Sequence, residues 1–257
     1  MLWKFYRGDP DVCHYIFGTM HLATDEAYTY VNKAQECIKG VSIYAAEMNL
    51  NEASGDELIS HFTLTDDLKF SGFFRPKQYE KYRKIILKAY KVDLLNYDDF
   101  TPFFMNNMLA ELSLPKTKKD ALDHYLWSFA TESGKEMMGV ESFEDQLRVL
   151  KNIPLDFQVK SFRSTIKNIK SFKSKLKKLN TLYAKGDIKQ IFRMSKKSMG
   201  KIRKMMIYDR NEHMSARILE ITANKPAFIA LGAAHLVGKK GVLSLLKKEG
   251  FTFRMMR

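Results

Sequence analysis

Two segments near opposite ends of the chain share one pattern: an apolar run, a glycine, two small or apolar residues and a histidine. The first ends with Gly18 to His21, and the second ends with Gly232 to His235. A continuous apolar run closed by glycine is typical of a buried strand that enters a tight turn. In open α/β sheets, ligands bind in the crevice at the carboxyl ends of the strands. We therefore expect two strands to deliver two imidazoles to one crevice.

Two glutamates stand at the ends of two further apolar runs. Glu47 follows residues 41–46, and Glu141 follows residues 137–140. A carboxylate that is buried without a partner costs several kcal/mol, so each of these positions indicates a specific role. The structural alternative for each glutamate is an ion pair with a buried arginine, and a histidine in either segment could equally be a hydrogen-bonded structural residue.

Histidine and glutamate together form a mixed nitrogen and oxygen donor set that suits Zn²⁺, Mn²⁺, Co²⁺ or Fe²⁺. A catalytic metal site takes about three protein ligands and leaves a position for water, whose pKa the ion lowers to about 7. We predict that His21, His235 and one of Glu47 and Glu141 hold a divalent metal ion. The other glutamate would then deprotonate the bound water, and the sequence leaves open which glutamate has which role.

A fifth candidate, Arg210, opens the helix expected before the second histidine strand. Its guanidinium could hold a substrate carboxylate or stabilise an oxyanion. Neutralising Glu47 or Glu141 structurally is the alternative. Asn211 follows it and supports the same motif, whereas His213 is offset along the helix and is expected to lie outside the site.

The alternation of apolar runs with helical periodicity predicts an α/β fold. Strands are expected over residues 1–7, at an edge, and over 14–19, 41–48, 135–141, 228–232 and 251–255, with 14–19 and 41–48 paired in parallel. Residues of about 52–205 read as a long helical insertion in one domain of 257 residues. We expect two similar α/β halves that form a mixed sheet.

The net charge of +14 is concentrated in one segment, residues 158–205, which holds 16 Lys and Arg and one acid. Apolar residues spaced by three and four positions predict one long amphipathic helix over residues 162–183. Its cationic faces are either solvated or a surface for an anionic partner such as nucleic acid or anionic lipid. No sequence module for nucleic-acid recognition accompanies them.

Other features limit the class of protein. No apolar run reaches the ~18 residues of a membrane span, and the N-terminus lacks the apolar core of a signal peptide. These features predict a cytoplasmic protein, or an exported one if a leader has been removed. The two cysteines, Cys13 and Cys37, have no metal-site spacing.

Several short motifs occur together and in order along nearly the whole chain, and in this the sequence resembles the TraB/GumN family. That family is similar to the Tiki-type metalloproteases and, more distantly, to the erythromycin-esterase-like and ChaN-like proteins. The motifs are Gly18 to His21, Glu47, Gly139 to Glu141 with Gln146 after it, Arg210 with Asn211, and Gly232 to His235.

The resemblance implies an α/β core with a helical insertion and a metal-dependent hydrolase that acts on peptide bonds. It places His21 and His235 at the metal or catalytic centre, Glu47 and Glu141 at the acidic positions, and Arg210 at the family's arginine. Two alternatives stay open. One is an esterase-like hydrolase that uses a histidine as general base without a metal, and the other is a binding protein whose basic helices engage an anionic partner.

Overall fold

Six strands of the described chain form one mixed sheet, and all six lie where the apolar runs predict them. The computed structural model describes residues 1–52, 59–65 and 67–256. An α/β fold with a mixed sheet is therefore confirmed. The strands are β1 (Leu2–Tyr6), β2 (His14–Thr19), β3 (Ile43–Met48), β4 (Glu136–Glu141), β5 (Ala227–Gly232) and β6 (Thr252–Met256).

The order of the strands in the sheet is β4-β3-β5-β2-β1-β6. The strands β2, β5, β3 and β4 are parallel to their neighbours, and β1 pairs antiparallel with both β2 and β6. Two expectations about pairing are wrong. The first strand is not at an edge, because β6 covers it, and β2 does not pair with β3, because β5 lies between them.

The chain divides into two units. The sheet unit comprises Met1–Glu52, Lys116–Val149 and Leu179–Arg257, and the helical unit comprises Ala53–Pro115 and Leu150–Lys178. The principal helices of the sheet unit are α1 (Val31–Lys39), α5 (Leu122–Glu132), α9 (Ile188–Met199), α10 (Arg210–Ile221), α11 (Ala233–Leu236) and α12 (Val242–Lys248). Two further helices include residues of both units, α6 (Phe143–Lys151) and α8 (Ile169–Ala184).

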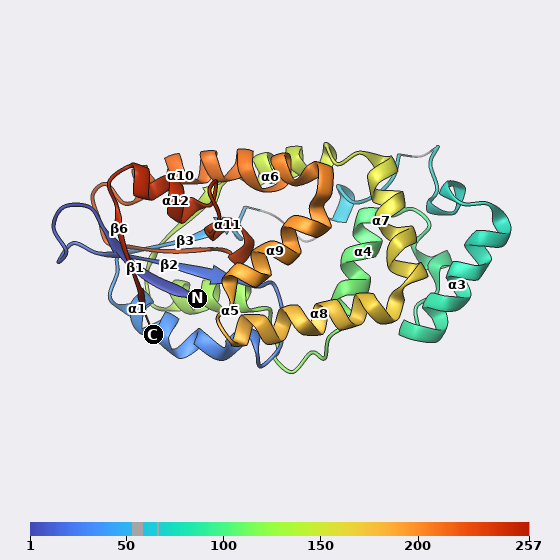
Figure 1. Ribbon diagram of the computed structural model, residues 1–257, viewed down its shortest axis with the longest axis horizontal. Helices are drawn as coiled ribbons and strands as arrows, with labels where there is room; N and C mark the ends of the chain where they lie inside the picture. The colour runs from blue at the N-terminus through green and yellow to red at the C-terminus, as the bar shows by residue number, and fades with distance from the viewer. Residues whose placement is uncertain (53–58, 66, 257) are drawn as a thin grey trace. The chain divides into compact units, whose positions relative to one another are not determined.

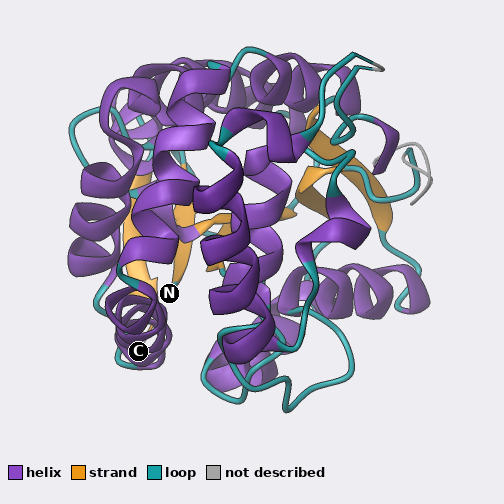
Figure 2. Ribbon diagram, turned by 90° about the vertical axis from the view of Figure 1, so that its right-hand side faces the viewer, coloured by secondary structure: helices purple, strands orange, loops and turns teal. Residues whose placement is uncertain are grey.

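Helices cover both faces of the sheet. In Figure 1, α1 and α5 lie on one face and α10 and α12 on the other, and Figure 2 shows the strands between the helices from a second direction. The central strand β5 is accordingly buried from Ala227 to Leu231, as expected for a parallel strand covered on both faces. In the core beneath α5, the ring of Tyr44 stacks on Phe228 and meets Trp127 edge-on. This packing joins β3 and β5 near their starts, where Tyr44 pairs with Phe228.

The helical unit has its own apolar core, in which Phe162 of α7 (Leu155–Lys167) packs against Phe70, Phe74 and Tyr82. The expected single helix over residues 162–183 is wrong, because α7 ends at Lys167 and α8 begins at Ile169. Among the described residues, no helix combines the length and hydrophobicity needed to span a bilayer. The helices of this unit are α3 (Pro76–Tyr90), α4 (Pro102–Glu111) and α7 (Leu155–Lys167), with short 3-10 turns at Phe70–Phe73 and Leu94–Tyr97.

The basic segment continues through α8 and α9. Helix α9 buries Ile188 and Ile191 in the core of the sheet unit, and its other faces carry exposed cations. These are Lys189, Arg193, Lys196 and Lys197. An anionic partner for this segment stays a prediction.

One buried histidine makes the stability of the fold depend on pH. His14, 3% exposed, packs against Phe5 and accepts a hydrogen bond at Nδ1 from the N–H of Ala227. Burial lowers its pKa from 6.5 to about 4. The unfolded chain therefore binds a proton between these pH values that the folded chain does not. We expect the free energy of unfolding to fall by up to about 3 kcal/mol as the pH is lowered from 6.5 to 4.

Urea unfolding of the wild type and of His14→Phe at a series of pH values measures this effect. The variant should lose the part of the pH dependence that comes from His14. An identical pH dependence in both proteins would contradict the assignment.

Candidate active site at the ends of the parallel strands

The carboxyl ends of three neighbouring strands bring Glu47, Glu141 and Gly232 together. These residues lie at the ends of β3, β4 and β5, which are consecutive in the sheet and parallel. Arg210, the first residue of α10, reaches into the same place from the face that α10 covers. Glu47, Glu141 and Arg210 therefore converge at the strand ends, as the sequence predicted.

Arg210 bridges the two glutamates. Its Nε lies 2.9 Å from Oε1 of Glu141, and its Nη2 lies 2.5 Å both from Oε2 of Glu141 and from Oε1 of Glu47. The side chains of Arg210 and Glu141 are only 11% and 5% exposed. A bidentate pair of this kind is geometrically specific, and burial makes each of its charges depend on the others. Arg210 therefore neutralises the two glutamates, which is the structural alternative that the sequence offered for it.

The surroundings push the pKa values of the two glutamates apart. Burial alone would raise the pKa of Glu47, but His235, Arg210 and the N–H of Gly232 outweigh it and lower the pKa to about 2. For Glu141, burial raises the pKa, and the hydrogen bonds from Arg210 offset this only in part. Carboxylates whose pKa values diverge are suited to different roles. Glu47 is fixed as an anion, and Glu141 is the better proton acceptor.

Asn211 orients the imidazole of His235 and fixes its tautomer. The amide of Asn211 is completely buried, and its Nδ2 donates to the carbonyl oxygens of His235 and Lys240, at 3.1 and 2.7 Å. This orientation turns Oδ1 towards Nδ1 of His235, which lies 2.7 Å away. Nδ1 must therefore carry the hydrogen, which leaves the lone pair on Nε2. Burial lowers the pKa of His235 to about 4, so the ring is neutral at pH 7.

Replacing Asn211 should change the tautomer of His235. Asn211→Leu removes the acceptor from Nδ1 and leaves the two carbonyl groups without their donor, and we expect it to lower the free energy of unfolding by about 2–4 kcal/mol. The ¹⁵N chemical shifts of the imidazole should show Nδ1–H in the wild type and a mixture of tautomers in the variant. Asn211→Asp keeps the acceptor and is the control, so it should retain Nδ1–H.

Both motif glycines stand where the backbone approaches a neighbour closely. The N–H of Gly232 donates to Oε2 of Glu47 at 3.0 Å, and a Cβ at this residue would lie 3.1 Å from that oxygen. A Cβ at Gly18 would lie 3.0 Å from Cδ1 of Leu236, and the hydroxyl of Tyr183 donates to the Gly18 carbonyl. A larger residue at either strand end would therefore have to displace the side chain of Leu236 or Glu47 by a few tenths of an ångström.

His21 lies apart from this cluster. Strands β2 and β5 are adjacent and parallel, with Thr19 beside Gly232, so the two histidine strands meet as expected. The imidazole of His21, however, is 73% exposed, and its Nδ1 lies 3.3 Å from Oδ2 of Asp123 in α5. His235 instead contacts Asn211 of α10, on the opposite face of the sheet (Figure 1). The described contacts therefore place the two imidazoles against different helices.

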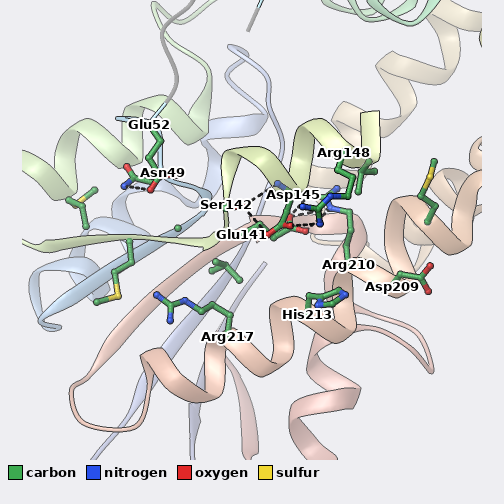
Figure 3. Close-up of a pocket in the computed structure, with 16 residues that line it drawn as sticks. Asn49, Glu52, Glu141, Ser142, Asp145, Arg148, Asp209, Arg210, His213 and Arg217 are labelled. Carbon is green, nitrogen blue, oxygen red and sulfur yellow. Dashed lines mark hydrogen bonds and ion pairs between the residues drawn. The ribbon is translucent and has the colours of Figure 1, made fainter. Parts of the chain in front are cut away.

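A cavity of about 670 Å³ opens beside the cluster. Glu141 and Arg210 line it, as Figure 3 shows, together with the end of β4 and side chains of α6 and α10. His213 also lines it, although the sequence placed this residue outside the site. Its spacing of three residues from Arg210 puts both on one face of α10, and that spacing is the signal that could have found it.

The comparisons with known proteins identify the family. The profile of the TraB/PrgY/gumN family matches residues 1–255. The chain belongs to this family. It is 22% identical to the metalloprotease TIKI1 of Danio rerio and 23% identical to that of Homo sapiens, in each case over 97% of the chain. A metalloprotease TIKI homolog of Nematostella vectensis is 23% identical over the same share of the chain.

The TraB-family chain is shorter than these relatives. It spans 62%, 60% and 65% of their respective lengths. No solved structure is significantly similar to the chain. The family resemblance drawn from the short motifs is confirmed, and each of these relatives is named a metalloprotease.

The predicted ligand set for a metal ion does not fit the arrangement of this TraB-family chain. Both carboxylates are engaged by Arg210, whose positive charge opposes a second cation beside them, and His21 faces Asp123. Among the described residues, no group of three or more histidine, cysteine, aspartate or glutamate side chains is arranged to hold a metal ion. His235 keeps a lone pair on Nε2, the form in which an imidazole binds a metal ion.

Proposed function

We propose that this member of the TraB/PrgY/gumN family is a hydrolase that cleaves peptide bonds in the cavity lined by Glu141 and Arg210. The observation that carries the proposal is the buried pair of these two residues on the cavity wall, backed by Glu47 and His235. The relatives' name, metalloprotease, supports the peptide bond as the target. The alternative of a purely structural ion pair would leave unexplained why it borders an open cavity.

Glu141 is the proposed general base. Burial raises its pKa, which makes its carboxylate a stronger base than an exposed glutamate. It takes a proton from a water molecule while the water oxygen forms a bond to the carbonyl carbon of the substrate. The C–N bond then breaks, and the proton passes from Glu141 to the leaving amine.

Arg210 is the proposed stabiliser of the negative charge that develops on the carbonyl oxygen, a role that a fixed cation performs without reorganisation. Glu47 holds Arg210 and the N–H of Gly232, so it is a positioning residue. His213, on the same face of α10 as Arg210, is a further polar side chain in the cavity that can hydrogen-bond the bound substrate.

The role of a metal is a matter for experiment. The name of the relatives implies a divalent ion, and Mn²⁺, Co²⁺, Zn²⁺ and Fe²⁺ are the candidates for the donor types present. Because the predicted ligand set does not fit an ion, the proposed steps use the side chains of the chain alone. Elemental analysis of the freshly purified protein determines whether it carries a metal.

A histidine base, as in an esterase-like mechanism, is the weaker proposal. The pKa of His235 is lowered to about 4, so its neutral ring is a poor proton acceptor at pH 7. Cleavage of an ester that is faster than cleavage of peptides and unaffected by a chelator would favour it.

The experiment is cleavage of a mixed peptide library followed by mass spectrometry. The protein is assayed as purified, after treatment with a chelator, and after addition of each of the four ions. We expect cleavage of internal peptide bonds that is lost in Glu141→Gln. Absence of peptide cleavage under every condition would overturn the proposal.

A further inference from the structure

The outer edge of β4 forms one side of the cavity. The strand is the last in the sheet on this side, and no described strand pairs with its outer edge. Five consecutive residues of it line the cavity, from Met137 to Glu141. An edge strand offers a row of unpaired N–H and C=O groups to another chain.

The outward groups of β4 can be assigned from its pairing with β3. The N–H of Glu136 donates to the carbonyl of Ser42, which precedes β3, so the backbone groups of Glu136 point inward. The pairing with β3 is regular from Glu136 to Gly139, and backbone groups alternate in direction along a strand, so those of Met138 also point inward. Those of Met137 and Gly139 point to the open edge.

Gly139, in the middle of β4, is packed closely against backbone atoms of Glu141 and Asn49. A Cβ at this residue would lie 2.7 Å from the carbonyl oxygen of Glu141 and 2.8 Å from the N–H nitrogen of Asn49. Only glycine fits, and it leaves no side chain beside the outward N–H and C=O.

The two helices that flank the edge line the cavity with both polar and apolar side chains. Helix α6 contributes Arg148 and Val149 to the cavity, and α10 contributes His213 and Arg217. Figure 3 shows Arg217 and His213 along α10 and Arg148 on the other side of the edge. Such walls provide pockets for the alternate side chains of an extended peptide, and the backbone of that peptide would pair with β4.

From these contacts we infer that the substrate is an extended peptide segment that binds as an added strand on the open edge of β4, with its scissile bond at the Glu141 end. The inference rests on the proposed peptidase function, and it names the form in which the substrate is recognised. A folded helical segment or a small ester would not satisfy the outward groups of Met137 and Gly139. Because the contacts are to the peptide backbone, we expect the protein to bind extended peptides of many sequences and not to bind folded segments.

The first test is a matched pair of variants on β4. Met137→Pro removes an outward N–H without removing a donor to β3, whereas Met137→Ala removes the same side chain and keeps the N–H. Both are exposed briefly, in the cold, to an immobilised array of linear peptides of about six residues, the length of β4. We expect Met137→Pro to bind the peptides that Met137→Ala retains about tenfold more weakly or worse.

The second test methylates each backbone nitrogen of one retained peptide in turn. Strand addition predicts a period of two: methylation should weaken binding about five- to tenfold at alternate positions and little at the positions between them. Circular dichroism checks that both variants of Met137 are folded. If Met137→Pro is not folded, the methylation series on the wild type decides.

The outcomes separate this inference from the proposed function. Equal binding by the two variants together with no alternation in the series would overturn strand addition, as would an array that retains no peptide. A concentration-dependent dimer that only Met137→Pro abolishes would instead assign the edge to a second copy of the chain, which also overturns it. Alternating binding without cleavage would leave strand addition standing and would end the peptidase proposal.

Discussion

Replacing Arg210 with methionine is expected to lower the free energy of unfolding by about 3–5 kcal/mol, because it leaves two neighbouring carboxylates without their shared cation. The side chain is 11% exposed and holds Glu141 through two nitrogens. Methionine preserves much of the packing of the arginine side chain, so the decrease in the free energy of unfolding comes chiefly from removal of the charge. Urea unfolding at pH 7 measures the difference between variant and wild type.

The acid dependence of stability should change in the same variant. Glu47 has its pKa lowered from 4.5 to about 2, so in the wild type its stabilising contribution is present above pH 4.5 and is lost as the pH falls towards 2. Without Arg210 part of this lowering disappears. We expect the stability of the variant to fall less steeply over this interval than that of the wild type.

A matched control lies two turns further along α10. Arg217 is 46% exposed and pairs with the exposed Glu220, so Arg217→Met should change stability by less than about 0.5 kcal/mol. Adding Glu141→Gln to Arg210→Met should restore part of the lost stability, since it removes one uncompensated charge. Equal effects of the two arginine substitutions would show that Arg210 is not the centre of a buried charge cluster.

The strands and the fold class could be predicted from the sequence because each strand is marked by its own short apolar run. The run before Gly232 is apolar throughout, and in the structure β5 is covered on both faces. The glutamates that end such runs also indicated where polar groups would meet. Glu47 and Glu141 lie at the carboxyl ends of neighbouring parallel strands and share Arg210.

Strand order and side-chain direction could not be predicted in the same way. The position of β5 between β2 and β3 depends on pairing between segments far apart in the chain, and several apolar strands could compete for that position. His21 lies beyond the end of β2, where the loop conformation sets its direction, and it faces Asp123, a residue about a hundred positions away in the chain. His235 is instead fixed within the short helix α11.

The break between α7 and α8 illustrates another limit. The apolar periodicity of residues 162–183 continues across the junction, yet Asn168 leaves the helical conformation, with a φ of −130° and a ψ of 44°. Hydrophobic spacing reports which face is buried, and it does not report where one helix ends and the next begins. The same limit applies to His213, whose place beside the cavity depends on the direction of α10.

The substitution expected to have the largest effect on activity is Glu141→Gln. Glutamine keeps the size of the side chain and an acceptor for Arg210 but cannot take a proton from water, so kcat/KM should fall by about 10²- to 10⁴-fold. Glu136→Gln is the matched control on the same strand, because Glu136 is exposed and pairs only with Lys225 among the described contacts. The control should retain wild-type activity.

The pH dependence identifies the group that titrates. Because burial raises the pKa of Glu141, the acid limb of kcat/KM in the wild type should lie above pH 4.5, with activity lost as the carboxylate is protonated. Glu47, with a pKa of about 2, cannot produce a limb in that range, so Glu47→Gln should lower the rate and keep the limb. The limb should move to lower pH, because the charge of Glu47 contributes to the raised pKa of Glu141. Loss of the acid limb in Glu47→Gln, or full activity in Glu141→Gln, would show that Glu141 is not the general base. The remaining candidates would then be His235 and a bound metal ion.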